Sequence, residues 1–212
     1  MNQRICRPWA GACASLCVPL LCGAIGKEFD RLSRVPLAWT DNEWGDCTSF
    51  PARRGFADLL AIFSEKPGKL PQQIAWTTAT NQDGGYLWFS LRDPGLLPTT
   101  VFWIENQGRH GMPWNGRNRC LGLEDVCSYL NEGMPISAQP NDVNRKGIPT
   151  AIELTPDRPT AVNYIQGVAK IPEGFRMVKD LEFGTNEVTF VSVTGKRMTV
   201  PVNFQFVRTG KL

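Results

Sequence analysis

Short β-rich runs, separated by turns that contain glycine or proline, recur through most of the chain and constrain its fold more than any other feature. The runs cover residues 74–80, 86–91, 99–106, 161–171, 187–194 and 197–207. Successive side chains of a strand point to opposite faces, so a hydrophobic period of two predicts strands. The runs do not alternate with long helices, which argues against a parallel fold. We therefore expect an all-β protein, an antiparallel β-sandwich.

Two pairs of these runs are predicted to form hairpins. A polar loop with two glycines, residues 81–85, joins the first pair, and Gly195-Lys196 joins the last pair as a two-residue turn of the II′ kind. The run at 99–106 is apolar on both faces, so it is expected inside a sheet. Residues 56–63 fit a helix and a strand equally well.

Composition narrows the classes of function. The chain has 212 residues, with 23 Lys and Arg against 20 Asp and Glu and a net charge of +3. That balance is too even for a protein whose affinity for nucleic acid comes from counterion release. No apolar run has the roughly 20 residues that span a bilayer. We expect neither a nucleic-acid partner nor membrane association.

The seven cysteines and the single histidine do not form a metal-binding pattern. Four cysteines lie within residues 6–22 and the others stand at 47, 120 and 127, without a CxxC pair. The sequence therefore predicts no metal and no cofactor. Reduced, inert thiols are typical of a cytoplasmic protein.

The N-terminal quarter differs from the rest. Residues 1–49 are expected to form a poorly defined leader or a truncated edge, and residues 50–212 the folded domain. Residues 1–26 combine two arginines with small and apolar residues, which is the outline of a signal peptide. Pro19 and Trp9 interrupt the apolar stretch, so export is the weaker alternative to a cytoplasmic location.

One loop is not explained by core packing. Residues 106–119 hold three arginines, three asparagines, a tryptophan and the only histidine. Planar donors that recognise hydroxyl groups, beside an indole on which a sugar ring stacks, are typical of a carbohydrate site. A glycine-rich surface loop with solvated arginines is the alternative. The predicted carbohydrate-binding residues are Arg109, His110, Trp114, Asn115, Arg117 and Arg119, of which Asn115, Arg117 and Arg119 are expected to line a polar concavity walled by Trp114.

Glu124 is the candidate for acid–base chemistry. Strand alternation places Leu121 and Leu123 on one face and Glu124 on the other, beside a glycine. The spacing of the residues that follow predicts a short helix capped by Gly133, whose dipole would favour the ionised carboxylate. A carboxylate that only caps this helix is the alternative interpretation.

Several of these segments together resemble a known family. Residues 85–94, 106–110 and 113–124, the last reading PWNGRNRCLGLE, are similar to galactose mutarotase-like (aldose 1-epimerase-like) proteins, most closely their uncharacterised bacterial branch. The similarity extends from about residue 50 to the C-terminus and includes residues 147–150. It implies an antiparallel β-supersandwich with a sugar cleft across one sheet. Because it covers the C-terminal portion of the family, the supersandwich is expected to be incomplete on its N-terminal side.

The resemblance also implies a role for Glu124. In the family, a glutamate in this position is the general base on the anomeric hydroxyl, and a histidine protonates the ring oxygen. That histidine belongs to an earlier part of the family's chain, whereas His110 lies in a different motif. The base is therefore assigned to Glu124 and the acid is left open.

Two functions follow as expectations. The chain is expected to bind a small sugar, an aldose, and to act as an aldose 1-epimerase if an acid completes the site. The alternative is a non-catalytic interaction module that uses Trp114, Arg117 and Arg119 as a binding patch for nucleic acid or protein. The sequence does not specify the oligomeric state.

Overall fold

The computed structural model of the protein describes residues 3–6, 15–19, 28–29, 31–36, 44–51, 57–130 and 132–212. These ranges are built mainly of antiparallel strands, which confirms the predicted all-β class and its sandwich-like character. Most of the predicted export signal lies outside the described residues. Among the described residues, none of the helices has the length and apolar character to cross a membrane.

Two five-stranded sheets form the centre of the molecule. The first has the order β12-β9-β8-β1-β6, which are Tyr164–Lys170, Tyr86–Arg92, Ala75–Asn81, Gln3–Cys6 and Ser49–Phe50. The second has the order β11-β10-β7-β2-β3, which are Arg119–Val126, Thr99–Asn106, Ala57–Phe63, Ser15–Pro19 and Glu28–Phe29. β11 and β12 are thus edge strands. Strands from before residue 50 pair in both sheets, and the predicted domain boundary at this residue stays a prediction.

Smaller elements surround the two sheets. A three-stranded sheet has the order β13-β14-β15, which are Val178–Phe183, Glu187–Ser192 and Arg197–Pro201, and β4 (Val35–Pro36) pairs with β5 (Trp44–Gly45). The α-helices of the described residues are α1 (Met134–Ser137), α2 (Asp142–Arg145) and α3 (Phe206–Thr209). Two 3₁₀ turns, Pro67–Lys69 and Pro71–Gln73, precede β8.

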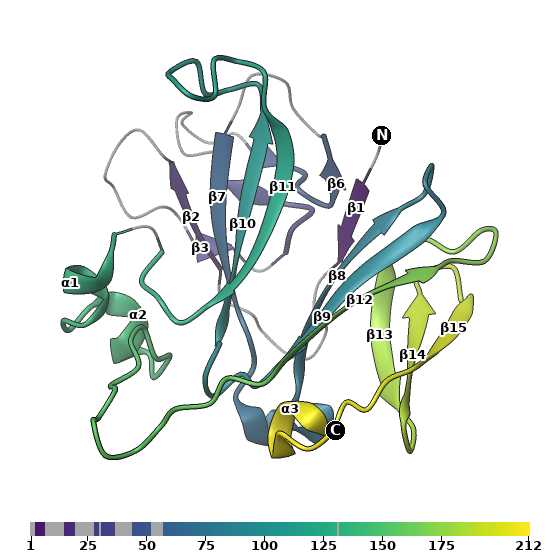
Figure 1. Cartoon of the computed structure of the whole chain (residues 1–212). Coiled ribbons are helices and arrows are strands. Elements are labelled where there is room, and N and C mark those ends of the chain that lie inside the picture. The colour runs from purple at the N-terminus through teal and green to yellow at the C-terminus, as the bar shows by residue number, and fades with distance from the viewer. Residues whose placement is uncertain are drawn as a thin grey trace.

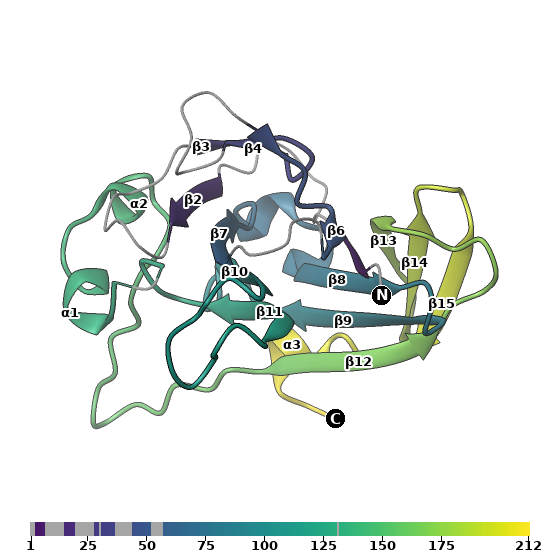
Figure 2. The same ribbon diagram turned by 90° about the horizontal axis from the view of Figure 1, so that it is seen from above.

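The two large sheets diverge like the arms of a V, with the ends of β9, β11 and β12 close together at its vertex (Figures 1 and 2). One face of the β8–β9–β12 sheet packs against the three-stranded sheet, in a core that includes Phe89, Leu91 and Phe190. The opposite face turns toward the other large sheet. There, Leu60 and Phe102 are buried with residues from the N-terminal part of the chain.

Several predicted strands are confirmed. β8 and β9 pair as the expected antiparallel hairpin. β10 lies between β7 and β11, as its two apolar faces predicted. Residues 57–63, for which helix and strand were both open, form strand β7.

The C-terminal strand is shorter than predicted. It ends at Pro201 instead of continuing to residue 207, because proline has no N–H to extend the ladder. Phe204 and Val207 stand three residues apart and bury their side chains from the turn that becomes α3. The hairpin turn also differs from the predicted II′ type. The Gly195 N–H donates to the Ser192 carbonyl at 2.9 Å, so the turn begins earlier and Gly195 takes its positive-φ position, at +81°.

The prediction of a short helix after Glu124 is wrong. β11 continues to Val126, and the next helix, α1, begins only at Met134. Gly133 is the N-cap of α1, with φ of 81°, and does not cap a preceding helix. Glu124 therefore lies within a strand, and the described residues 127–130 form no helix whose dipole would favour its carboxylate.

Candidate functional site

β10 and β11 pair in register, and alternate residues of the two strands share one face of the sheet. Val101 lies opposite Glu124, Trp103 opposite Gly122, and Glu105 opposite Cys120. These six side-chain positions define what we call the Trp103 face. Leu121 and Leu123 pack on the other side of β11, against the core between the sheets. The predicted separation of Glu124 from the two leucines is therefore confirmed.

Glu124 is exposed and lies over the glycine of its own strand. A Cβ atom added to Gly122 would come within 3.0 Å of Glu124 Oε1 and 3.1 Å of Trp103 Cβ. The Glu124 carboxylate thus occupies the space that the glycine leaves, next to Trp103. Any larger residue at 122 would push these two side chains apart.

Trp103 anchors a cluster of aromatic and charged side chains. Its ring meets that of Trp114 at a centroid distance of 5.2 Å with an interplanar angle of 70°. The Arg109 guanidinium carbon lies 5.1 Å from the Trp103 ring centroid and 5.6 Å from that of Trp114. A cation at such distances is attracted by the electron-rich ring faces. The loop is therefore folded back onto the sheet through Arg109 and Trp114.

Glu105 fixes the start of this loop. Its side chain is fully buried, and Oε1 accepts hydrogen bonds from the backbone N–H of Gly108 at 2.7 Å and of Arg109 at 3.1 Å. Oε2 lies 3.7 Å from Arg109 Nε. A further backbone bond, from the Gln107 N–H to the Asn118 carbonyl at 2.8 Å, closes the base of the loop. Strand β10 and its carboxylate thus hold Arg109 in place.

The predicted loop residues separate into two groups. Arg109 and Trp114 lie on the Trp103 face with Glu124, as described above. His110, Asn115, Arg117 and Arg119 are exposed. The Arg119 guanidinium donates to Gln107 Oε1 at 3.1 Å. The His110 ring lies against Gly116, because a Cβ added to this glycine would be 3.1 Å from His110 Nδ1. The concavity expected around Asn115, Arg117 and Arg119 stays a prediction.

The charges of the Trp103 face affect the pKa of the Cys120 thiol. Burial is the main cause that raises the pKa of its thiol, and a hydrogen bond from Asn118 lowers it. The charges of Glu105 and Glu124 raise the pKa further, while that of Arg109 lowers it. The raised pKa keeps the thiol protonated at neutral pH, so Cys120 is a poor nucleophile.

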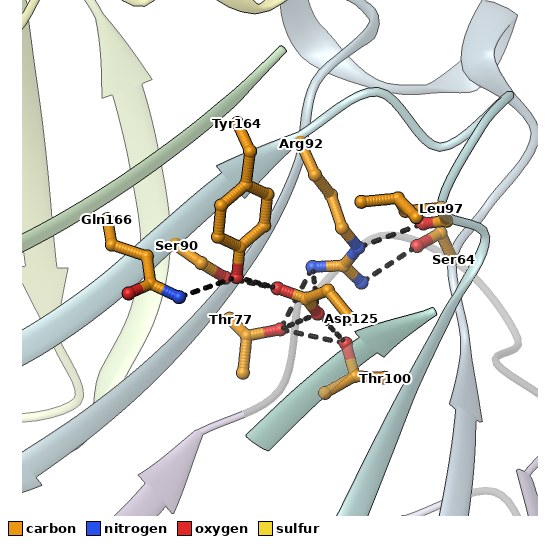
Figure 3. Close-up of polar contacts among 9 residues, drawn as sticks. All are labelled: Ser64, Thr77, Ser90, Arg92, Leu97, Thr100, Asp125, Tyr164 and Gln166. Carbon is orange, nitrogen blue, oxygen red and sulfur yellow. Dashed lines mark hydrogen bonds and ion pairs between the residues drawn. The ribbon is translucent and has the colours of Figure 1, made fainter. Parts of the chain in front are cut away.

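Asp125, the neighbour of Glu124, anchors β11 to the other sheet through the buried network of Figure 3. One of its oxygens lies 3.0 Å from the Arg92 guanidinium, and both side chains are 1% exposed. The same oxygen accepts from Thr100 at 2.5 Å, and the other accepts from Ser90 at 2.7 Å and from the Tyr164 hydroxyl at 2.6 Å. Strands of both large sheets therefore meet at this one carboxylate.

The Arg92 end of the network is equally well satisfied. Its guanidinium donates to the Leu97 carbonyl at 3.0 Å, to Thr77 at 3.0 Å and to Ser64 at 3.1 Å. Burial, and next the charge of Asp125, raise the pKa of Tyr164, which keeps its hydroxyl protonated as a donor. Because the pair is sealed from solvent, we interpret it as a structural clamp that sets the position of β11 and hence of Glu124.

A cleft opens between the sheets on the side of β11 opposite Glu124. It has a volume of about 480 Å³. Trp88, Tyr86 and Asn81 line it from one sheet, and Leu121 and Leu123 from the other. None of the residues predicted to bind sugar lines this cleft. The Trp103 face and the cleft are thus two separate features on the two sides of the same strand.

Sequence reasoning missed three residues of this region: Trp103, Glu105 and Asp125. Trp103 and Glu105 stand two residues apart in the predicted strand at 99–106, and a glutamate in a strand that is otherwise largely apolar was the available signal. The described residues contain no group of three or more His, Cys, Asp or Glu side chains that could hold a metal ion. No family model, curated protein or solved structure matches the chain.

Proposed function

We propose that this protein binds carbohydrate, an aldose, on the Trp103 face. The observation that carries the proposal is the placement of Arg109 against the indoles of Trp103 and Trp114, with the carboxylates of Glu105 and Glu124 on the same face. Sugars have apolar C–H faces and polar edges. Indoles suit the faces, while guanidinium and carboxylate groups hydrogen-bond the hydroxyls.

The resemblance to galactose mutarotase-like proteins supports the same proposal. It assigns the general base to Glu124, and an exposed carboxylate next to Trp103 is accessible to a sugar bound on this face. Aldose 1-epimerase activity is the extension of the proposal. It requires a general acid in addition to this base, because each contributes roughly 10²- to 10⁴-fold to such a reaction.

Calorimetric titration with D-galactose, D-glucose and D-mannose tests the binding proposal. We expect Trp114→Ala to weaken binding by about fivefold or more, since stacking on one aromatic ring is worth on the order of 1 kcal/mol or above. Trp44→Ala is the matched control: Trp44 is 49% exposed and carries Arg34 at 4.3 Å from its ring centroid, outside the site. Equal effects of the two variants, or no binding of any of these sugars by the wild type, would contradict the proposal.

Turnover is measured separately by polarimetry on freshly dissolved α-D-galactose. If the protein is an epimerase, Glu124→Gln should reduce the rate by about two orders of magnitude while sugar binding is retained. The alternative interaction module, built on Trp114, Arg117 and Arg119, is favoured if sugars fail to bind and a single-stranded oligonucleotide does bind.

A further inference from the structure

Three polar atoms of the Trp103 face are buried without a hydrogen-bond partner among the described residues. They are Trp103 Nε1, Glu105 Oε2 and Arg109 Nε. The distance of 3.7 Å between Glu105 Oε2 and Arg109 Nε is that of an ion pair and is too long for a hydrogen bond. Buried polar groups in native proteins are nearly always paired, so three unpaired atoms in one cluster point to a missing partner.

The three atoms belong to one small region. Trp103 and Glu105 are two residues apart on β10, so their side chains point to the same side of the sheet. Arg109 lies over the Trp103 ring and beside the Glu105 carboxylate. A single small group in this region could therefore contact all three side chains.

The chemistry of the atoms specifies that group. Indole Nε1 and guanidinium Nε are donors, and the carboxylate oxygen is an acceptor. A hydroxyl group has two acceptor lone pairs and one donor hydrogen, so it can satisfy two donors and one acceptor at once. A carboxylate or phosphate ligand would instead meet the Glu105 charge, and an ammonium ligand would leave both donors unpaired.

We propose that Trp103 Nε1, Arg109 Nε and Glu105 Oε2 together bind one hydroxyl group of the carbohydrate and thereby determine which sugar is accepted. This rests on the proposed function and adds to it a specificity-determining pair, Trp103 and Glu105. The three atoms are shielded from solvent and the Arg109 side chain is 26% exposed, so this side chain moves aside to admit the hydroxyl.

A site of this kind discriminates strongly against a ligand that lacks the hydroxyl. Removing it leaves buried charged groups unpaired, and such a loss weakens binding by about tenfold or more. Hydroxyls at the solvent-facing edge of the sugar carry no such penalty. One position of the sugar ring should therefore dominate recognition.

The test combines a ligand series with a protein variant. Binding of D-galactose and D-glucose and of their monodeoxy derivatives is measured by calorimetry for the wild type, Trp103→Phe and the control Trp114→Phe. We expect one monodeoxy sugar to bind the wild type about tenfold or more weakly than its parent. Trp103→Phe should weaken the parent sugar and reduce the discrimination at that one position. Trp114→Phe removes an indole N–H from the same cluster and should leave the discrimination intact.

The outcomes separate this inference from the proposed function. If the parent sugars do not bind the wild type, the proposed function fails and this inference fails with it. If they bind but every monodeoxy derivative binds within about threefold of its parent, the cluster does not contact a sugar hydroxyl and only the inference is overturned. The same conclusion follows if Trp103→Phe discriminates as the wild type does. The ligand series on the wild type decides the question even if Trp103→Phe folds poorly.

Discussion

Replacing Asp125 by Asn should strongly destabilise the protein. The Asp125 side chain is 1% exposed, and its carboxylate neutralises the equally buried Arg92. In the variant, Arg92 keeps its hydrogen bonds to the hydroxyls of Thr77 and Ser64 and to the Leu97 carbonyl, which are uncharged acceptors. The variant thus removes the negative charge that lies 3.0 Å from this buried guanidinium.

The magnitude follows from the geometry of the pair. Breaking a buried, hydrogen-bonded ion pair by removing one partner costs about 3 to 5 kcal/mol. The Asn amide also places a donor where Thr100, Ser90 or Tyr164 donates to the wild-type carboxylate. In a chain of 212 residues, 1 kcal/mol shifts the melting midpoint by roughly 2 to 4 °C. The melting midpoint of the variant should therefore be lower than that of the wild type by about 6 to 20 °C.

The assay is urea unfolding followed by tryptophan fluorescence and circular dichroism, with thermal melting alongside. Glu182→Gln is the control, because Glu182 pairs with Arg197 on the surface and should leave the midpoint unchanged. The double variant with Arg92→Met separates charge pairing from packing, since residues in contact show coupling of about 0.5 to 3 kcal/mol. An Asp125→Asn variant within about 0.5 kcal/mol of wild type, or additive effects in the double variant, would refute the clamp.

Three further outcomes are expected. The contribution of the Tyr164 hydroxyl to stability should be fully present below pH 10 and be lost as the pH rises further, because the pKa of Tyr164 is raised above its usual value of 10.0. Tyr164→Phe should reduce this loss of stability at high pH in urea titrations. Glu124→Gln should lower the pKa of Cys120 and speed its alkylation by iodoacetamide, followed by mass spectrometry of the Cys120 peptide; an unchanged rate would show that the two side chains are not neighbours. Gly167→Ala should destabilise by about 1 to 3 kcal/mol, because the added methyl overlaps the Phe89 ring, whereas Gly111→Ala meets nothing within 4 Å; equal midpoints would contradict this packing.

Strands could be predicted from sequence where apolar side chains alternate and turn residues such as proline or glycine mark the end of the run. The bounds of β10 agree with the predicted residues, because Thr99–Asn106 follows a proline turn and is apolar on both faces. The C-terminal strand was predicted too long since the alternation of Val202, Phe204 and Phe206 continues past Pro201, where packing replaces the ladder with a helical turn. Periodicity alone cannot distinguish a strand from a turn that buries the same residues.

The site could be predicted only in part. Alternation correctly placed Glu124 opposite the leucines of β11, and the loop composition drew attention to Arg109 and Trp114. The role of Asp125 could not be read locally, because its partner Arg92 stands 33 positions earlier and only the meeting of two sheets brings them together. Asp125 lies on the same face of β11 as Leu121 and Leu123. A charged residue on this apolar face is the one sequence signal for a buried polar contact.

A single NMR titration decides whether the Trp103 face binds carbohydrate. The protein has seven tryptophans, so ¹⁵N labelling gives seven indole N–H signals, which single Trp→Phe variants assign. On addition of D-galactose, D-glucose or D-mannose, the Trp103 and Trp114 signals should shift and saturate together while that of Trp44 stays in place. If no indole signal moves, or if only tryptophans outside this face respond, the Trp103 face is not a carbohydrate site.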